Sequence, residues 1–188
     1  MKKLSEMTLD ELWALFPIIL SPHSAEWKDF FHAEKAQISS ILSAFSPRIS
    51  HIGSTAVTGI YAKPTVDILA ELKTANDLSC AAELLTQSGW LIMSKSADRI
   101  SLNKGYTEQG FAERVFHLHL RLLGDNDELY FRDYLLKYPQ IAKEYETLKL
   151  SLWKQFERNR DGYTQAKTQF VQKYTSLAKQ EFSDRYKR

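Results

Sequence analysis

The sequence predicts an α+β fold in which a mixed sheet of about four or five strands has helices against one face and is followed by a C-terminal helical section. Apolar residues recur at helical spacing before residue 47 and again after residue 126. Between these stretches, short segments alternate apolar and polar residues, as strands with one buried face do. A further helical segment lies inside the alternating part, so helices and strands are expected to share one core.

Two helices are predicted ahead of the sheet. Thr8 and Glu11 form a capping-box pattern at the start of the first helix, and Pro17 limits its length. The second helix begins near Ser24, and Pro47 ends it. Its apolar side chains recur at a spacing of roughly 3.6 residues, which gives the helix one face to bury against the sheet.

The sheet is predicted from a change to a period of two. The expected strands are residues 49–53, 65–72, 90–93, 99–104 and 113–123. Between the second and the third strand, Thr74 caps a helix that Gly89 ends. The last strand alternates most regularly, and its period places His117 and His119 on the same face.

The chain after residue 126 is predicted to be helical. Pro139 stands at a favourable first position of one helix, and residues 158–162 form a break before the last. We therefore expect residues 1–125 to form a core of strands and helices that includes the N-terminal helices. Residues 126–188 are expected to form a helical section packed on that core.

The composition of the 188-residue chain indicates a cytoplasmic globular protein. Cys80 is the only cysteine, so no intramolecular disulfide is expected, as suits a reducing compartment. The sequence has no run of about 20 apolar residues to cross a membrane and no signal-peptide pattern at its start. Lysine and arginine number 25 against 23 acidic residues, and this near balance argues against general nucleic-acid binding.

One turn of the expected sheet has the chemistry of a phosphate site. Residues 51–55, His-Ile-Gly-Ser-Thr, lead a strand into a Gly-Ser turn, which exposes backbone N–H groups and the hydroxyl of Ser54. Gly53 would let a phosphate approach the backbone closely. An ordinary Gly-Ser turn is the alternative, because such turns are common.

Two polar groups on the expected strands are further candidates. Asp67 lies inside an apolar strand, where a carboxylate is costly unless it faces a wet cleft or a cation. Glu71 on the same face supports the alternative that this face is simply exposed to solvent. His117 and His119 are spaced to bind a metal or a phosphate, and an exposed polar strand face is the alternative for them.

The Gly-Ser turn and the strand aspartate thirteen residues after Ser54 together resemble the layout of the nucleotidyltransferase superfamily. Residues 51–68, HIGSTAVTGIYAKPTVDI, resemble the signature of the GrpB family. The segments PIILSPHSAEWKDFFHAEK, HLHL, FRDYLLKYPQIAKEYETLK and RDGYTQAKTQFV resemble other blocks of this family, and the likeness extends from about Pro17 to Tyr174. The resemblance implies a nucleotidyltransferase-like fold with a C-terminal helical section.

The resemblance also implies a set of site residues. Asp67, His117 and His119 would be the catalytic candidates, and Asp67 would bind Mg²⁺ or Mn²⁺. The residues that would hold a nucleoside triphosphate or another phosphorylated small molecule are His51, Gly53, Ser54, Lys63, Arg132, Arg160, Tyr163 and Lys167. The metal ion and the basic residues would neutralise the charge that develops on a departing pyrophosphate.

One position departs from the superfamily pattern. Active nucleotidyltransferases carry a second acid two residues after the first, and this chain has Leu69 there, which cannot bind a hard cation. Glu71 is on the same strand face but roughly 13 Å from Asp67 by strand rise.

Two functions are therefore expected from the sequence. One is nucleotidyl transfer from a nucleoside triphosphate to a small substrate, and the other is binding of a nucleotide or phosphorylated metabolite without catalysis. The intact Gly-Ser turn fits both functions, and Leu69 favours the second. RNA binding by the C-terminal helices is a weaker hypothesis, because core packing explains the helical spacing of their aromatic residues.

Overall fold

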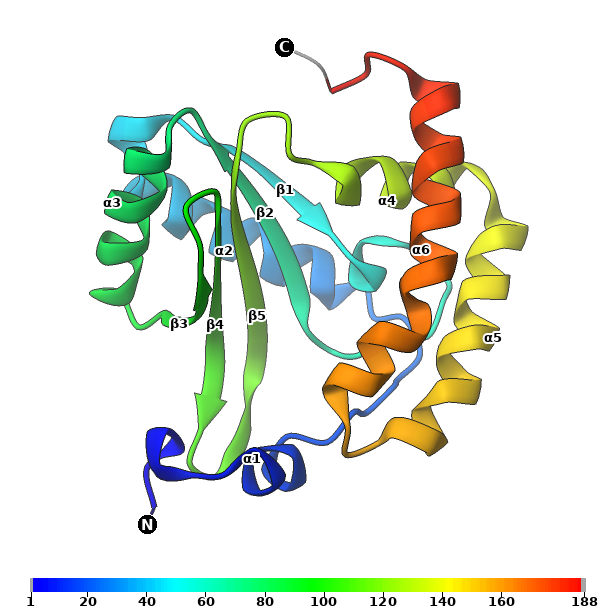
Figure 1. Cartoon of the computed structure of the whole chain (residues 1–188), viewed down its shortest axis with the longest axis horizontal. Helices are drawn as coiled ribbons and strands as arrows, with labels where there is room; N and C mark the ends of the chain where they lie inside the picture. The colour runs from blue at the N-terminus through cyan, green and yellow to red at the C-terminus, as the bar shows by residue number, and fades with distance from the viewer. Residues whose placement is uncertain (1, 187–188) are drawn as a thin grey trace.

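A computed structural model describes residues 2–186 and has the α+β fold that the sequence predicts (Figure 1). Its mixed sheet has the strand order β1-β2-β5-β4-β3. Strands β2 and β5 are parallel neighbours, and the other neighbouring pairs are antiparallel. The strands are β1 (Arg48–Ile52), β2 (Val66–Leu72), β3 (Leu91–Lys95), β4 (Arg99–Thr107) and β5 (Gly110–Leu122).

The helices precede, interrupt and follow the sheet. They are α1 (Leu9–Leu15), α2 (Glu26–Ile41), α3 (Ala75–Thr86), α4 (Asp127–Lys137), α5 (Pro139–Phe156) and α6 (Arg160–Phe182). Short 3-10 turns are η1 (Leu4–Glu6), η2 (Ser43–Phe45) and η3 (Ser54–Ala56). Capping boxes at Thr8 and Thr74 begin α1 and α3, and Pro139 lies in the first turn of α5, as the sequence predicts.

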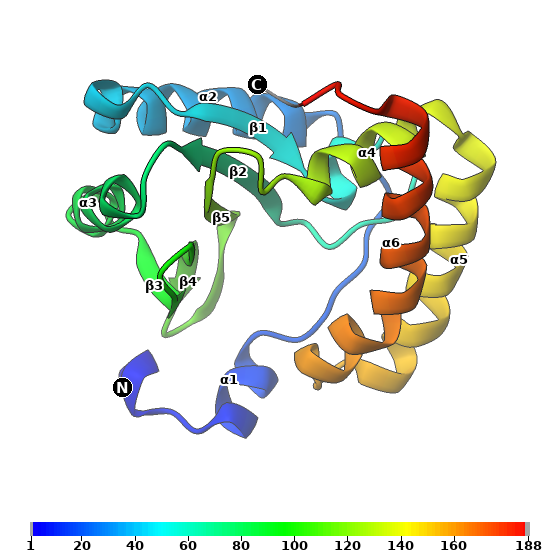
Figure 2. The same ribbon diagram turned by 45° about the horizontal axis from the view of Figure 1, so that its top comes forward.

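Helices α2 and α3 cover one face of the sheet and form the main hydrophobic core with it (Figure 2). Ile68 and Ala70 of β2, and Leu118 and Leu120 of β5, point to this face and are fully buried. Because side chains alternate along a strand, the residues between them point to the opposite face. That opposite face carries the candidate site.

Helices α4, α5 and α6 pack together beside β1 and β2 (Figures 1 and 2). Ile52 of β1 and Leu69 of β2 form a small buried cluster with Leu129 of α4. Val57 and Ile60, which follow η3, belong to a second cluster with residues of α4 and α5. These two clusters join the C-terminal helices to β1, β2 and the connection between them.

Several element boundaries differ from the sequence-based expectation, and the clearest differences are at the start of α6 and in the β4–β5 hairpin. The break expected at residues 158–162 is shorter, because α6 begins at Arg160 and the side chain of Asn159 accepts a hydrogen bond from the Gly162 N–H (2.8 Å). Strands β4 and β5 extend beyond their predicted ends into a long hairpin that turns near residues 107–110. None of the described helices is long and apolar enough to span a membrane.

Candidate functional site

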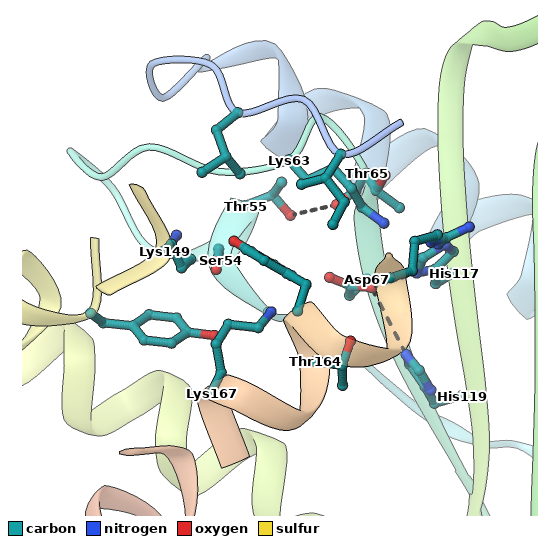
Figure 3. A pocket seen from close by; sticks show the side chains of 16 residues that line it. Ser54, Thr55, Lys63, Thr65, Asp67, His117, His119, Lys149, Thr164 and Lys167 are labelled. Atoms are coloured by element: carbon teal, nitrogen blue, oxygen red, sulfur yellow. Dashed lines mark hydrogen bonds and ion pairs between the residues drawn. The ribbon is translucent and has the colours of Figure 1, made fainter. Parts of the chain in front are cut away.

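A cavity of about 320 Å³ lies where the β1–β2 connection, β5, α5 and α6 meet (Figure 3). It holds both the Gly-Ser corner and the strand aspartate, so these two groups face one shared space. Figure 3 shows Lys149 and Ser54 on one side and Asp67 with the histidines on the other. The polar residues that line it are Gly53, Ser54, Thr55, Lys63, Thr65, Asp67, His117, His119, Tyr145, Lys149, Arg160, Tyr163, Thr164 and Lys167.

Gly53 brings the corner against Asp67. The backbone of Gly53 has φ 71° and ψ −173°, a combination that is essentially restricted to glycine. A Cβ atom at this position would lie 2.4 Å from Oδ2 of Asp67. Glycine therefore lets the end of β1 pass this close to the carboxylate, directly before the first turn of η3.

His51 supports the corner from the α2 side of the sheet. Its ring stacks on Phe31, with ring centroids 4.8 Å apart, and its Nε2 atom is 2.9 Å from the hydroxyl oxygen of Thr55. Burial lowers the pKa of His51 to about 4, so the ring is neutral at pH 7. His51 does not line the cavity. Its contact with Thr55 places it behind the corner, and its expected role as a phosphate ligand stays a prediction.

Asp67 is held by the two histidines of β5. The parallel register places His117 directly beside Asp67. The Oδ1 atom of Asp67 lies 3.1 Å from Nδ1 of His117 and 3.9 Å from Nε2 of His119. Burial on its own would raise the pKa of Asp67, but its hydrogen bond with His117 and its contact with His119 outweigh burial and hold the pKa well below its usual range. The carboxylate is therefore charged at neutral pH.

His117 uses both ring nitrogens within the protein. Its Nδ1 atom faces Asp67, and its Nε2 atom is 2.8 Å from the hydroxyl of Tyr106, a residue that the sequence analysis does not single out. The Tyr106 oxygen in turn accepts a hydrogen bond from Arg160 (3.0 Å). Burial lowers the pKa of His117 to about 4, and Asp67 offsets this only in part. A neutral ring with both nitrogens engaged orients Asp67 and offers no free nitrogen to act as a base.

Three lysines line the cavity. We call Lys63, Lys149 and Lys167 the pocket lysines, and the cavity the cationic pocket. Lys63 follows Ala62, which pairs with Ser21 through two backbone hydrogen bonds (2.9 and 3.0 Å). Burial lowers the pKa of Lys63 and Lys149 to about 7 and that of Lys167 to about 8.

The acidic residues near the pocket do not balance these cations. Arg160 adds a fourth cationic group, and Asp67 is the only carboxylate lining the pocket among residues 2–186. Leu69 is fully buried, and Glu71 is 2% exposed and ion-paired with Arg48. The alternative that this strand face is exposed to solvent is therefore wrong, and Glu71 does not supply the missing second acid.

The donor set does not fit a divalent cation held by the protein alone. Mg²⁺ and Mn²⁺ favour several oxygen ligands, and the single carboxylate here has one oxygen beside His117 and the other beside Gly53. In the part of the chain that the structure describes, no group of three or more His, Cys, Asp or Glu side chains could hold a metal ion. A metal site at Asp67, as the resemblance implies, would therefore lack a full set of protein ligands.

Most of the expected site residues meet in the cationic pocket, but Arg132 does not. Its guanidinium donates to the carbonyl of His51 (2.8 Å) and to Asp133 (2.9 Å), so it ties α4 to the end of β1. Conversely, Lys149 lines the pocket at 2% exposure and is not among the residues expected from the sequence. Lys149 lies four residues after Tyr145, on the same face of α5. A lysine beside an apolar helical stripe is the signal that could identify it.

Comparison with known proteins establishes the family. A family model described as GrpB protein matches residues 17–177. The chain belongs to the GrpB family. The glutamate-rich protein GrpB of Alkalihalophilus pseudofirmus is 34% identical over 159 residues, which cover 82% of this chain and 91% of the relative. The crystal structure of GrpB from Enterococcus faecalis matches with a TM-score of 0.75 at 25% identity and covers 87% of this chain and 99% of that chain.

A more distant likeness relates this GrpB fold to nucleotidyltransferases. The structure of the Cid1 poly(U) polymerase with bound MgGTP matches with a TM-score of 0.50 at 10% identity. The match covers 69% of this chain and 42% of that chain. At this identity the likeness shows the fold alone. The nucleotidyltransferase-like fold expected from the sequence is thus confirmed.

Proposed function

We propose that this GrpB-family protein binds the phosphate groups of a nucleoside triphosphate or another phosphorylated small molecule in the cationic pocket. One observation carries the proposal: four cationic side chains surround a single carboxylate beside the Gly53–Ser54 corner. A ligand with several negative charges balances that surplus, and a neutral ligand does not. Because the cations belong to the protein, binding of this kind needs no resident metal ion.

The lowered pKa values of the pocket lysines support an anionic ligand. Burial disfavours their charged forms, with a pKa of about 7 for Lys63 and Lys149 and about 8 for Lys167. An anion in the pocket favours the protonated lysines and raises these pKa values again. Binding near neutral pH therefore takes up protons, and ligand charge and lysine charge stabilise each other.

A hydroxyl without a partner supports the same proposal. Tyr163 lines the pocket and is 7% exposed, and its hydroxyl has no hydrogen-bond partner within residues 2–186. Buried polar groups without partners are uncommon in native proteins. A phosphate oxygen in the pocket would accept a hydrogen bond from this hydroxyl.

A titration with inorganic triphosphate tests the proposal. We expect binding without added metal, and a gain of about 2.7 kcal/mol in the free energy of unfolding at a ligand concentration about 100 times the Kd. For a chain of this length, that gain corresponds to a rise of roughly 5–10 °C in Tm. If millimolar triphosphate leaves the Tm unchanged, the pocket is not a phosphate site.

Matched lysine variants locate the binding. Lys167→Met should weaken triphosphate binding about 10–150-fold, because a hydrogen bond to a charged group contributes roughly 1.5–3 kcal/mol. Lys28→Met removes a lysine from the exposed surface of α2 and should leave the Kd unchanged. Equal effects of both substitutions would indicate a general charge effect and would contradict a defined site.

Tyr163→Phe separates a ligand contact from a structural one. Removing a hydroxyl that has no described protein partner should leave the Tm of the ligand-free protein unchanged or slightly higher. The same substitution should raise the Kd for triphosphate about 2–12-fold, the equivalent of one hydrogen bond of roughly 0.5–1.5 kcal/mol. A lower Tm with an unchanged Kd would show that the hydroxyl serves the fold.

Nucleotidyl transfer is the second candidate function. The close approach of Gly53 to Asp67, within a nucleotidyltransferase-like fold, favours it. The incomplete metal-ligand set and the buried Leu69 favour binding without transfer. Incubation with each nucleoside triphosphate, Mg²⁺ or Mn²⁺ and a small-molecule acceptor that bears a hydroxyl or amino group separates the two, because transfer of the nucleotidyl group to the acceptor releases pyrophosphate and binding alone does not. Asp67→Asn should abolish any such metal-dependent release and leave the protein folded.

A further inference from the structure

We propose that the ligand is a phosphate ester whose uncharged ring lies in a second compartment of the same site, beyond Asp67. This inference rests on the proposed function. The second compartment is a cavity of about 530 Å³ bordered by the end of β1, α4 and α6. Its volume alone falls within the range of about 300–1,000 Å³ that is typical of small-molecule sites.

The two cavities share a wall. Gly53, Ser54 and Asp67 line both of them, and so do Tyr145 and Thr164. A ligand whose phosphates lie at the Gly53–Ser54 corner therefore borders both compartments at once. The rest of such a molecule has room on the far side of Asp67 without leaving the protein.

The second compartment differs from the cationic pocket in charge. Its carboxylates are Asp67, Asp127 and Glu128, and within the described residues Lys179 is its only lysine or arginine. Lys179 forms an ion pair with Asp127. Another phosphate here would meet carboxylates instead of available cations, so this compartment excludes a second anionic group and accepts a neutral or cationic one.

The walls of the second compartment combine apolar and neutral polar surface. Phe131 and Val171 lie against the same hydrophobic cluster and supply the apolar part. Gln172, Thr175 and Ser176 lie at helical spacing on one side of α6 and supply an amide and two hydroxyls. This mixture fits a ring that carries hydroxyl or amino groups.

Two kinds of molecule share that chemistry. A nucleotide presents a ribose and a base next to its phosphates, and a sugar phosphate presents a hydroxylated ring. Both join an anionic end to an uncharged ring, as the two compartments require. The nucleotide fills more of the second compartment, and the titration below distinguishes the two sources.

The experiment compares ligands with and without the ring. Calorimetric titrations use inorganic triphosphate, the four nucleoside triphosphates, inorganic phosphate and a hexose phosphate. We expect at least one ring-bearing ligand to bind about tenfold or more tightly than its inorganic counterpart. An advantage of the nucleotides identifies a nucleoside in the second compartment, and an advantage of the hexose phosphate identifies a sugar.

Matched tryptophan variants then locate the ring. Gln172→Trp, and independently Ser176→Trp, fill the second compartment from exposed positions on α6 that do not line the cationic pocket. Both should remove most of the ring's advantage and leave the Kd for inorganic triphosphate unchanged. Gln169→Trp, on an exposed part of α6 outside both cavities, is the control and should behave like the unmodified protein.

The outcomes separate the inference from the proposed function. If triphosphate binds but no ring-bearing ligand gains affinity, or if the advantage survives in both tryptophan variants, the second compartment is not the ring site and the phosphate site stands. If triphosphate does not bind at all, both proposals fall.

Discussion

Gly53→Ala tests the geometry on which the candidate site depends. The backbone at Gly53 has φ 71° and ψ −173°, and a side chain there costs about 1–3 kcal/mol from backbone strain alone. The added Cβ would also lie 2.4 Å from Oδ2 of Asp67. Either the carboxylate rotates away from His117 or the end of β1 shifts.

The expected loss of stability is the sum of these two effects. If the Asp67 carboxylate rotates away from His117, a hydrogen bond to a charged group is lost. Such a hydrogen bond contributes roughly 1.5–3 kcal/mol to the free energy of unfolding. With the backbone strain, Gly53→Ala should lower the free energy of unfolding by about 2.5–6 kcal/mol. For a chain of this length, the Tm should fall by roughly 5–24 °C.

Two comparisons isolate the contact with Asp67. Gly59 also has a positive φ, 78°, but a Cβ atom added there would meet no atom within 4 Å other than those of its adjacent residues. Gly59→Ala should therefore cost only about 1 kcal/mol, from backbone strain. In an Asp67→Ala background the carboxylate oxygens are gone, and Gly53→Ala should cost about 1.5–3 kcal/mol less than in the unmodified protein. Urea unfolding measures all four variants. Equal losses at Gly53 and Gly59, or no relief in the Asp67→Ala background, would refute the close approach.

Three further predictions follow from the same structure. The affinity for inorganic triphosphate should fall as the pH rises from 7 to 9. The pocket lysines of the ligand-free protein have pKa values of about 7 or 8 and lose their protons in this range, whereas those of the bound protein keep them. A triphosphate affinity that stays constant with pH in calorimetric titrations would contradict this prediction. Glu71→Gln should lower the free energy of unfolding by about 3–5 kcal/mol by breaking the buried pair with Arg48, without changing the Kd for triphosphate. Leu69→Asp should cost at least about 3 kcal/mol and create no metal binding, because this position is fully buried; metal-dependent stabilisation of that variant would contradict the prediction.

The fold is predictable from the sequence where the signals are local. Thr8 and Thr74 cap their helices through residues only three positions away, and both caps are present. The regular alternation of residues 113–123 identifies β5 and places its two histidines on one face. The start of α6 is predicted too late, because Gly162 suggests a break, whereas Asn159 caps the helix ahead of it.

The candidate site is less predictable, because its charges are satisfied by partners far apart in the chain. Glu71 is paired with Arg48, a residue 23 positions earlier that becomes its neighbour only when β1 and β2 pair. The guanidinium of Arg132 donates a hydrogen bond to the carbonyl of His51, 81 positions earlier in the chain. From its charge alone, Arg132 is expected to bind a phosphate group. Which charged side chains remain available to a bound molecule depends on the tertiary packing.

The histidines of β5 contact Asp67 in place of the cationic side chains that surround it in the pocket. A carboxylate among several cations would ordinarily form an ion pair with one of them and cancel part of the charge. Asp67 instead contacts His117, whose ring is neutral because burial lowers its pKa to about 4. Arg160 donates to the neutral hydroxyl of Tyr106 and not to the carboxylate. Among the described residues Asp67 therefore forms no ion pair with a lysine or arginine of the pocket, and under the proposed function these cations contact the phosphate groups instead.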